Sequence, residues 1–403
     1  MMPRSQFNAK KPEAAHHLAI DGAKPVRSTL LPYGHQSISE EDIQTVVATL
    51  RSPFLTRGPA VDHFERAVAD LVQMPYAVAF ANGTAALHAV MALLNLGKED
   101  RVVTSPITFA ATSNAVLYAG GRVEFQDVES KTLNLHISEL KNLDKVKAVA
   151  AVDFAGNPCD YAELRKLQKK FGFQLISDAA HSLGASLNGE VGGSFGDLNI
   201  LSFHPVKSIT TGEGGMVLTR NANEAEFLRR FRSHGIVRFQ DRPGYYEQVE
   251  LGYNYNITDL QCSLGISQLS QLSRFISKRR KIADRYNEFF SKFEELETPH
   301  LTPGAESSWH LYPLRLNLKY LSVNRDEFLK ALIAENIGAN VHYIPVYWHP
   351  YYTKIGFSRE LCPQAEAEYL REISLPIFPS MTDKDIADVC QAVEKIVAAY
   401  SAK

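Results

Sequence analysis

Residues 148–180 read AVAAVDFAGNPCDYAELRKLQKKFGFQLISDAA. Apolar runs at 148–154 and 173–180 are typical of buried strands, and they enclose the segment 159–172. In that segment apolar and aromatic side chains recur at helical spacing, at Tyr161, Leu164, Leu167 and Phe171. A strand, a helix and a second strand in this order predict two parallel strands that are joined by a helix.

The same alternation extends outward from this unit. Strands are predicted at 102–106 and 123–125, and an amphipathic helix is predicted at 83–97. Such alternation predicts an α/β fold with a large, mostly parallel sheet covered by helices on both faces. A long helix, continuous or broken midway, is predicted for 257–290, and a smaller α/β domain follows it. We therefore expect a loose N-terminal arm (1–28), a large domain (29–270) and a small C-terminal domain (271–403).

The bulk composition is that of a globular protein with more than one domain. The 403 residues are 45% hydrophobic and 22% charged, with a formal net charge of −2, which gives no reason to expect nucleic acid or an anionic membrane as a partner. No run approaches the ~18 apolar residues of a membrane span, and the polar N-terminus lacks the apolar core of a signal peptide. Four scattered cysteines without a CxxC pair argue against a zinc site, so we expect a cytoplasmic protein without a metal.

Asp178 is the first residue that suggests chemistry. It ends an apolar strand run, and ligands of parallel sheets bind at the carboxyl ends of the strands. An ionised carboxylate there can pair with a protonated ring nitrogen, as the pyridine ring of pyridoxal 5'-phosphate (PLP) requires in order to act as an electron sink. For a lone aspartate after a strand, a helix N-cap is the more common interpretation.

Lys207 lies in the stretch LSFHPVKSITTGEGG, residues 201–215. Its Ser, His, Pro, Thr and Gly neighbours indicate a loop or turn. A lysine that forms an imine with PLP needs a pKa below the ordinary value of about 10.4, through burial or a nearby cation. His204 is a candidate neighbour for that purpose. Taken alone, a lysine in such a loop is more often a solvated surface residue.

Hydroxyl and amide groups that can hold a phosphate complete the pattern. Gly83 and Thr84 open a predicted helix, where backbone amides and a hydroxyl bind anions. Ser202 offers a second hydroxyl five residues before Lys207. A Gly-Thr helix start is common, but the order and spacing of these groups with Asp178 predict a PLP enzyme in which Lys207 is catalytic.

At these residues the sequence resembles the DegT/DnrJ/EryC/StrS family of sugar aminotransferases. The resemblance extends from about residue 20 to the C-terminus. It rests on the motifs FANGTAALHAVMALL, SPITFAATSNAVLYAGGRVEFQDV, ISDAAHSLGA, GSFGDLNILSFHPVKSITTGEGGMVLT, RSHGI and LGYNYNITDLQCSLG. The family implies the aspartate-aminotransferase type of fold (PLP fold type I), with PLP as the cofactor.

The resemblance also implies roles for single residues around the cofactor ring. Lys207 matches the imine lysine, and Asp178 matches the partner of the pyridine nitrogen. His181 matches the position that contacts the phenolic oxygen of the cofactor. Phe109 matches the aromatic ring that stacks on the pyridine, although a phenylalanine at this place also suits the hydrophobic core.

Further matched positions concern the phosphate and a second subunit. Gly83, Thr84 and Ser202 match the phosphate-binding residues. Asn254 matches an asparagine that reaches the phosphate of the neighbouring subunit's cofactor, and Asn256 is the alternative because some relatives use that position. The family thus implies a homodimer with shared active sites.

Within the family the likeness is greatest to the C4 aminotransferases of pseudaminic acid biosynthesis, on HPVKSITTGEGG, SSWHLYPLRL, VHYIPVYWHPYY and EISLP. This implies transfer of an amino group from L-glutamate to C4 of a UDP-linked 4-keto-6-deoxy-N-acetylhexosamine. Bacillosamine-type or GDP-linked (perosamine-type) 4-keto sugars are alternatives. The positions matched to the sugar-nucleotide pocket are Tyr33, Pro53, Phe54, Leu55, Thr56, His342, Tyr343, Ile344 and Pro345. Routine aromatic packing is the alternative for the two tyrosines.

Three rival functions are weighed against this one. Sugar dehydratases of the family carry histidine at the imine position, where this chain has Lys207, so transamination is favoured. A non-catalytic regulator with the same fold would not need Asp178, Lys207, Thr84 and Ser202 together. A Rossmann dehydrogenase needs a GxGxxG motif that opens a helix after a strand, and the sequence has none.

Overall fold

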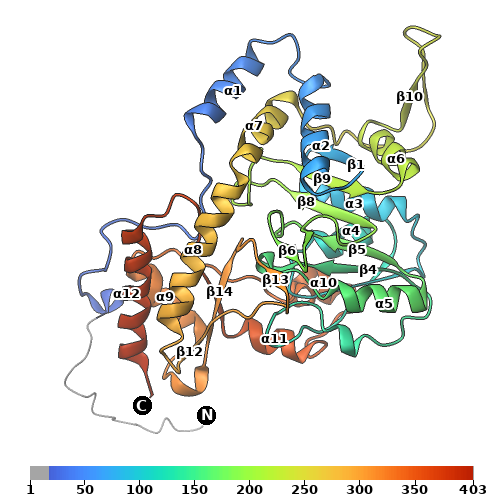
Figure 1. Ribbon diagram of the computed structural model, residues 1–403. Helices are drawn as coiled ribbons and strands as arrows, with labels where there is room; N and C mark the ends of the chain where they lie inside the picture. The colour runs from blue at the N-terminus through green and yellow to red at the C-terminus, as the bar shows by residue number, and fades with distance from the viewer. Residues whose placement is uncertain (1–17, 403) are drawn as a thin grey trace.

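Figure 1 shows the computed structural model, which describes residues 18–402. Its large domain is built on a seven-stranded sheet in the order β1-β9-β8-β5-β4-β2-β3. The strands are β1 (Tyr76–Phe80), β2 (Arg101–Thr104), β3 (Arg122–Phe125), β4 (Val146–Val152), β5 (Gln174–Asp178), β8 (Leu198–Ser202) and β9 (Gly215–Thr219). The strand β9 runs opposite to the other strands of this sheet, which are all parallel to one another. The predicted large, mostly parallel sheet is confirmed.

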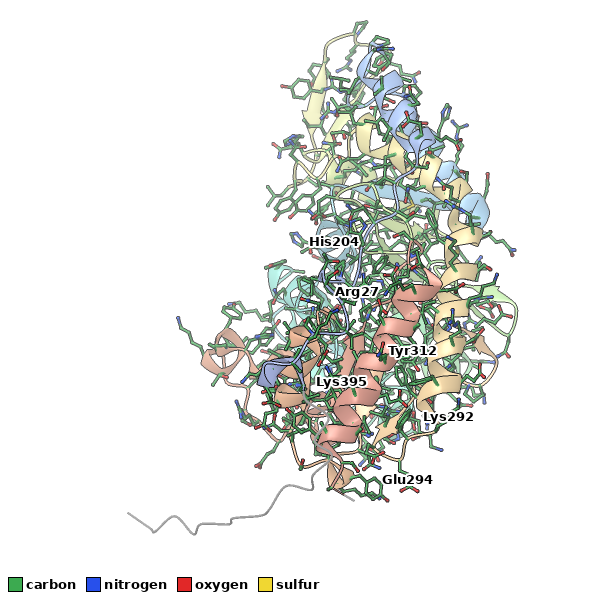
Figure 2. The ribbon with its side chains drawn as sticks, turned by 90° about the vertical axis from the view of Figure 1, so that its left-hand side faces the viewer. Arg27, His204, Lys292, Glu294, Tyr312 and Lys395 are labelled. Atoms are coloured by element: carbon green, nitrogen blue, oxygen red, sulfur yellow. The ribbon has the colours of Figure 1, made fainter. Side chains whose placement is uncertain are left out.

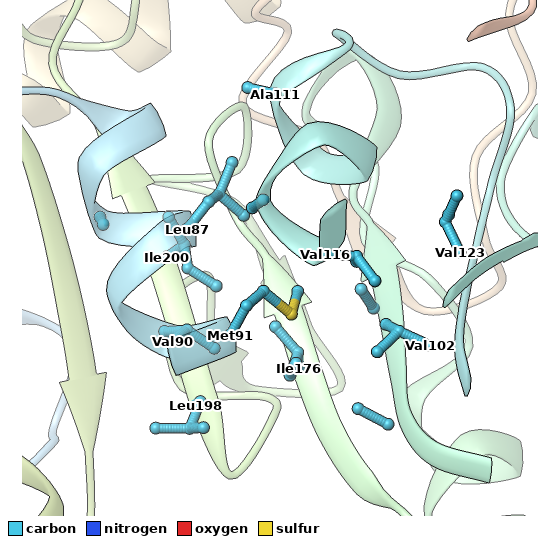
Figure 3. Close-up of a cluster of buried hydrophobic side chains, with 14 of the residues drawn as sticks. Leu87, Val90, Met91, Val102, Ala111, Val116, Val123, Ile176, Leu198 and Ile200 are labelled. Atoms are coloured by element: carbon cyan, nitrogen blue, oxygen red, sulfur yellow. The ribbon is translucent and has the colours of Figure 1, made fainter. Parts of the chain in front are cut away.

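Helices cover both faces because successive strand residues point to opposite sides. On β4, Ala148 and Ala150 pack towards α3 (Gly83–Leu93), α4 (Ala111–Tyr118) and α6 (Ala222–Arg232). Figure 3 shows this side, where Met91 of α3 lies beside Ile176 of β5. On the other face lie α2 (Pro59–Leu71), α5 (Tyr161–Phe171) and α7 (Asp259–Ser270).

The C-terminal domain has an antiparallel sheet in the order β12-β14-β15. Its strands are β12 (Leu296–Glu297), β14 (Tyr312–Leu316) and β15 (Glu372–Leu375), and its helices include α9 (Arg325–Ala334) and α12 (Asp383–Tyr400). Further α-helices and strands are α1 (Glu40–Leu50), β6 (Ser186–Leu187), β7 (Glu190–Val191), β10 (Ile236–Arg238), β11 (Tyr246–Gln248), β13 (Ala305–Glu306), α10 (Pro350–Lys354) and α11 (Pro363–Tyr369).

The helix α8 (Leu272–Phe290) joins the two domains. The predicted long helix is present and is broken at Gln271, between α7 and α8. Phe275 near the start of α8 packs in the core of the large domain, whereas Tyr286 near its end packs in the core of the small one. The helix α8 therefore passes from the core of the large domain into the core of the small domain. This passage lies about two turns after the predicted boundary at 270/271.

Residues 18–28 are not the loose arm that the sequence suggested. Leu18 is buried in the core of the small domain. The Glu335 carboxylate accepts the backbone N–H groups of Ala19 and Val26, both over 2.9 Å. Arg27 pairs with two aspartates of α12, and Figure 2 shows Arg27 beside that helix. Polar residues can be anchored by hydrogen bonds to distant elements, which local composition does not reveal. Residues 1–17 of the predicted arm lie outside the described residues.

Two findings in residues 18–402 concern membrane-spanning helices and metal sites. No helix in that part of the chain is long and apolar enough to cross a membrane. The same residues contain no group of three or more His, Cys, Asp and Glu side chains arranged to hold a metal ion.

Candidate active site

A cavity of about 1140 Å³ opens at the carboxyl ends of the parallel strands. Val152, Asp178 and Ser202 reach it from the ends of β4, β5 and β8. The N-terminus of α3 lines one side, and residues 340–344 of the small domain line another. This is the edge at which parallel α/β sheets bind their ligands.

Asp178 is the last residue of β5 and is 4% exposed. The hydroxyl of Thr112 donates to its Oδ2 over 2.7 Å, and the backbone N–H of Ala180 donates to its Oδ1 over 3.3 Å. Burial raises the pKa of Asp178, while these two hydrogen bonds and the Lys207 amine oppose the rise. A cationic ring nitrogen beside the carboxylate would favour its ionised form further.

Lys207 lies in the loop between β8 and β9, as predicted, but it is not a solvated surface residue. Burial lowers the pKa of its amine to about 8, Asp178 opposes this change, and the positive charge of Arg279 adds to it. The Nζ atom lies 3.4 Å from Nε2 of His310. The neutral amine, which is the form that attacks a carbonyl, is therefore roughly a tenth of the total at pH 7, far more than for a lysine with the ordinary pKa of about 10.4.

Three buried histidines surround this amine. Burial, together with the Lys207 charge, holds the pKa of His181 and of His310 well below the usual range and lowers that of His342 to about 3. The His181 and His310 rings are 4.2 Å apart, and the Tyr343 hydroxyl lies 3.3 Å from His181 Nε2. The sequence did not single out His310, although it lies in the motif SSWHLYPLRL, which supported the likeness to the C4 aminotransferases.

A cradle for a phosphate is built where α3 begins. Asn82 caps the helix by accepting the N–H of Ala85, so the amides of Gly83 and Thr84 remain at its open end. A Cβ atom on Gly83 would lie 3.1 Å from Ser202 Cβ, because the helix end approaches β8 closely. Because residue 83 is a glycine, the backbone amides at the start of α3 and the Ser202 hydroxyl can converge on one site. The helix dipole favours an anion at this site.

Phe109 lines the same cavity and is 62% exposed in this chain. Its ring centroid lies 6.4 Å from that of Tyr343. The alternative interpretation of Phe109 as a core residue is therefore wrong. An exposed aromatic face at a cavity edge suits a flat ligand ring.

The cavity brings together most of the residues predicted from the sequence. Those that line it are Tyr33, Gly83, Thr84, Phe109, Asp178, His181, Ser202, Lys207, His342, Tyr343 and Ile344. Those that do not line it within one chain are Pro53, Phe54, Leu55, Thr56, Asn254, Asn256 and Pro345. The Asn256 side-chain amide donates to Asn254 Oδ1 over 2.9 Å, and Phe54 is exposed. Asn254 and Asn256 were expected to act on a neighbouring subunit's cofactor, so their roles stay predictions.

The residues present fit PLP. A buried carboxylate lies at a strand end, an amine with a lowered pKa is beside it, an aromatic face borders the cavity, and a helix terminus offers phosphate donors. This fold and this site define a PLP-dependent enzyme of the aspartate-aminotransferase type. The chain belongs to the DegT/DnrJ/EryC1/StrS aminotransferase family, which matches residues 36–394.

Relatives and solved structures agree with this assignment. The UDP-4-amino-4,6-dideoxy-N-acetyl-beta-L-altrosamine transaminase of Campylobacter jejuni (serotype O:23/36, strain 81-176) is 38% identical over 360 residues, covering 88% of this chain and 94% of that protein. Helicobacter pylori PseC, an aminotransferase involved in the biosynthesis of pseudoaminic acid, has a TM-score of 0.88 at 29% identity, covering 92% of this chain and 100% of that chain. The PLP-form of Spr1654 from Streptococcus pneumoniae, described as a putative sugar aminotransferase, has a TM-score of 0.84 at 28% identity, covering 91% of this chain and 99% of that chain.

The protein is accordingly a PLP-dependent sugar aminotransferase. The Rossmann dehydrogenase and the non-catalytic regulator, which the sequence alone left open, are set aside by the family and by the relatives that are named transaminases.

Proposed function

We propose that this enzyme transfers an amino group from L-glutamate to C4 of a UDP-linked 4-keto-6-deoxy-N-acetylhexosamine, in a pathway to pseudaminic acid. The observation that carries the proposal is the similarity to the Campylobacter transaminase over 94% of that protein's length. A cavity of about 1140 Å³ supports it, because the space exceeds the few hundred Å³ that a small ligand needs.

Lys207 is the proposed catalytic residue. When bound, PLP supplies the electron sink for bonds that break at the substrate carbon. Lys207 Nζ would hold the cofactor, and its free amine would take and return the proton at the substrate carbon. Its lowered pKa, about 8, suits both directions of this proton transfer.

Other residues bind and orient the cofactor in this proposal. Asp178 pairs with the ring nitrogen, and its bond from Thr112 keeps the carboxylate in place. Phe109 covers one face of the ring. His181 contacts the phenolic oxygen, with Tyr343 fixing its ring through Nε2.

The remaining assignments concern the phosphate and the assembly. Gly83, Thr84 and Ser202 bind the phosphate at the start of α3. Asn254 or Asn256 reaches the phosphate of a second copy's cofactor, which makes the enzyme a homodimer with shared sites. A cytoplasmic location stays a prediction from the sequence.

The sugar nucleotide is proposed to lie against Tyr33, His342, Tyr343 and Ile344, which line the cavity. The Ser374 hydroxyl fixes the orientation of the His342 ring, because it lies 2.8 Å from His342 Nδ1. That contact leaves Nε2 as the ring nitrogen for a substrate group. The segment Pro53 to Thr56 and Pro345 would complete the pocket in the assembled dimer.

Incubation with glutamate and a panel of UDP- and GDP-linked 4-keto sugars tests the proposal. We expect an aminated product only from the UDP-linked N-acetylhexosamine of L-arabino configuration, with the new amine at C4 by mass and NMR; the bacillosamine-type sugar is its D-xylo isomer. Turnover restricted to the bacillosamine-type isomer or to a GDP sugar would refute the proposed substrate and leave the family assignment intact.

A further inference from the structure

Arg279 lies in the middle of α8 and is 1% exposed. Its Nη1 donates to the backbone carbonyls of Trp309 (3.2 Å), His310 (3.3 Å) and Ile377 (2.7 Å). Its Nη2 donates to the carbonyl of Val206 over 3.3 Å. One guanidinium therefore joins a loop of the large domain to two segments of the small domain. It lies where α8 passes from the core of one domain into the core of the other.

In the described part of the chain, the charge of Arg279 has no carboxylate to balance it. Within residues 18–402, no Asp or Glu oxygen lies within the ion-pair distance of 4.0 Å from this guanidinium. Arg315 is buried to the same degree, yet it pairs with Glu297 and Glu368. Burying a cation against dipoles alone is costly, so packing by itself gives no reason for an arginine at position 279.

Two of the four carbonyls that Arg279 binds belong to Val206 and His310, and both residues are close to Lys207. Val206 directly precedes Lys207 in the chain. His310 supplies the Nε2 atom that lies 3.4 Å from Lys207 Nζ. Arg279 thus holds the backbone on both sides of the Lys207–His310 pair, although these two residues lie 103 positions apart.

We propose that Arg279 is a positioning residue for Lys207, which fixes the Lys207–His310 pair across the domain junction and adds an unbalanced positive charge to the surroundings of the amine. The inference rests on the proposed catalytic role of Lys207. Burial lowers the pKa of Arg279 itself only to about 10, so the guanidinium stays charged at neutral pH. Its charge lowers the pKa of Lys207 in addition to burial.

The other groups that face Lys207 in the described chain do not supply this charge. Asp178 is an anion and acts in the opposite direction. Four histidines near the amine have pKa values below their ordinary range: His181, His204, His310 and His342. Glu213 and Tyr343 line the same cavity, and neither can carry a positive charge. Arg279 is accordingly the positive group that acts on the amine.

Two substitutions and a neighbouring control separate the charge of Arg279 from its packing. Arg279→Met keeps much of the side-chain volume and removes the charge, whereas Arg279→Lys keeps the charge and loses the fork of donors. Arg280→Met is the control, because Arg280 is next on the same helix and pairs with Glu306 at the surface. The PLP-loaded enzyme is titrated with pH while its visible absorbance is followed. In parallel, acetic anhydride labelling of Lys207 in the cofactor-free enzyme is followed by mass spectrometry across pH.

We expect Arg279→Met to raise both midpoints by roughly one pH unit, the size of effect of a nearby charge. Arg279→Lys should stay within about half a unit of the wild type, and Arg280→Met should not change. Unchanged midpoints in Arg279→Met would overturn the proposal. If that variant does not fold, a midpoint in Arg279→Lys raised by a full unit would overturn it equally. A wild-type protein that binds no PLP would instead refute the role of Lys207 itself.

Discussion

The hydroxyl of Thr112 donates to Oδ2 of Asp178 over 2.7 Å, and both residues are buried. The contact joins the first turn of α4 to the end of β5, so it orients the carboxylate towards the cavity. A hydrogen bond to a charged group contributes about 1.5–3 kcal/mol. Thr112 is therefore expected to matter for the reaction although it forms no covalent bond with the cofactor.

Thr112→Val should lower kcat roughly tenfold or more and weaken PLP binding, because Asp178 loses its side-chain donor. Steady-state kinetics and PLP titration measure both effects. Thr104→Val is the matched control: its buried hydroxyl donates to the Ala150 carbonyl within the sheet, away from Asp178. Equal losses in the two variants would show that Thr112 contributes only to packing.

PLP uptake by the cofactor-free enzyme should follow the ionisation of Lys207. The amine attacks only when it is neutral, and its pKa is lowered to about 8. Below that pH the neutral fraction falls about tenfold per unit, and above it the fraction approaches a constant. The uptake rate should therefore rise to about pH 8 and then level off. Lys207→Ala should form no adduct that borohydride can fix.

A surface lysine would behave differently in the same experiment. Its uptake rate would keep rising towards pH 10, since the ordinary lysine pKa is about 10.4. That profile in the wild type would contradict the lowered pKa of Lys207.

Ser374 offers a test of substrate binding by His342. The Ser374 hydroxyl donates to Glu372 Oε1 over 2.5 Å and lies 2.8 Å from His342 Nδ1. Ser374→Ala frees the imidazole to turn, so KM for the sugar nucleotide should rise about five- to tenfold, the equivalent of one hydrogen bond. KM for glutamate should change less. Ser263→Ala, which removes a buried hydroxyl on α7, is the control, and an equal effect there would refute the role of Ser374.

The sequence predicts residues whose roles depend on local position. Asp178 follows an apolar strand, Lys207 lies in a glycine-rich loop, and Gly83 opens a helix, so each could be placed at the ligand edge of a parallel sheet. His310 and Arg279 could not be found in this way. Each acts through a partner far away in the chain, and the Lys207–His310 distance depends on how the small domain packs on the large one.

The arm shows the same limit for stability. The mostly polar start of the chain suggested a loose arm over residues 1–28, but the backbone N–H groups of Ala19 and Val26 donate to Glu335, more than 300 positions later. Long-range hydrogen bonds of this kind follow from the tertiary fold and leave no periodic pattern in the sequence.

Glu335 is the residue through which the N-terminal segment stabilises the small domain. Its fully buried carboxylate accepts the N–H groups of Ala19 and Val26 and pairs with Lys395 over 2.7 Å. Glu335→Gln removes the charge and leaves a donor facing other donors, which should lower the free energy of unfolding by about 1–3 kcal/mol. Urea unfolding measures this loss, and limited proteolysis within residues 18–28 should become faster. Glu99→Gln is the control, since Glu99 forms an exposed pair that contributes little. A Glu335→Gln protein as stable as the control would mean that the segment is held by Leu18 and the Arg27 pairs alone.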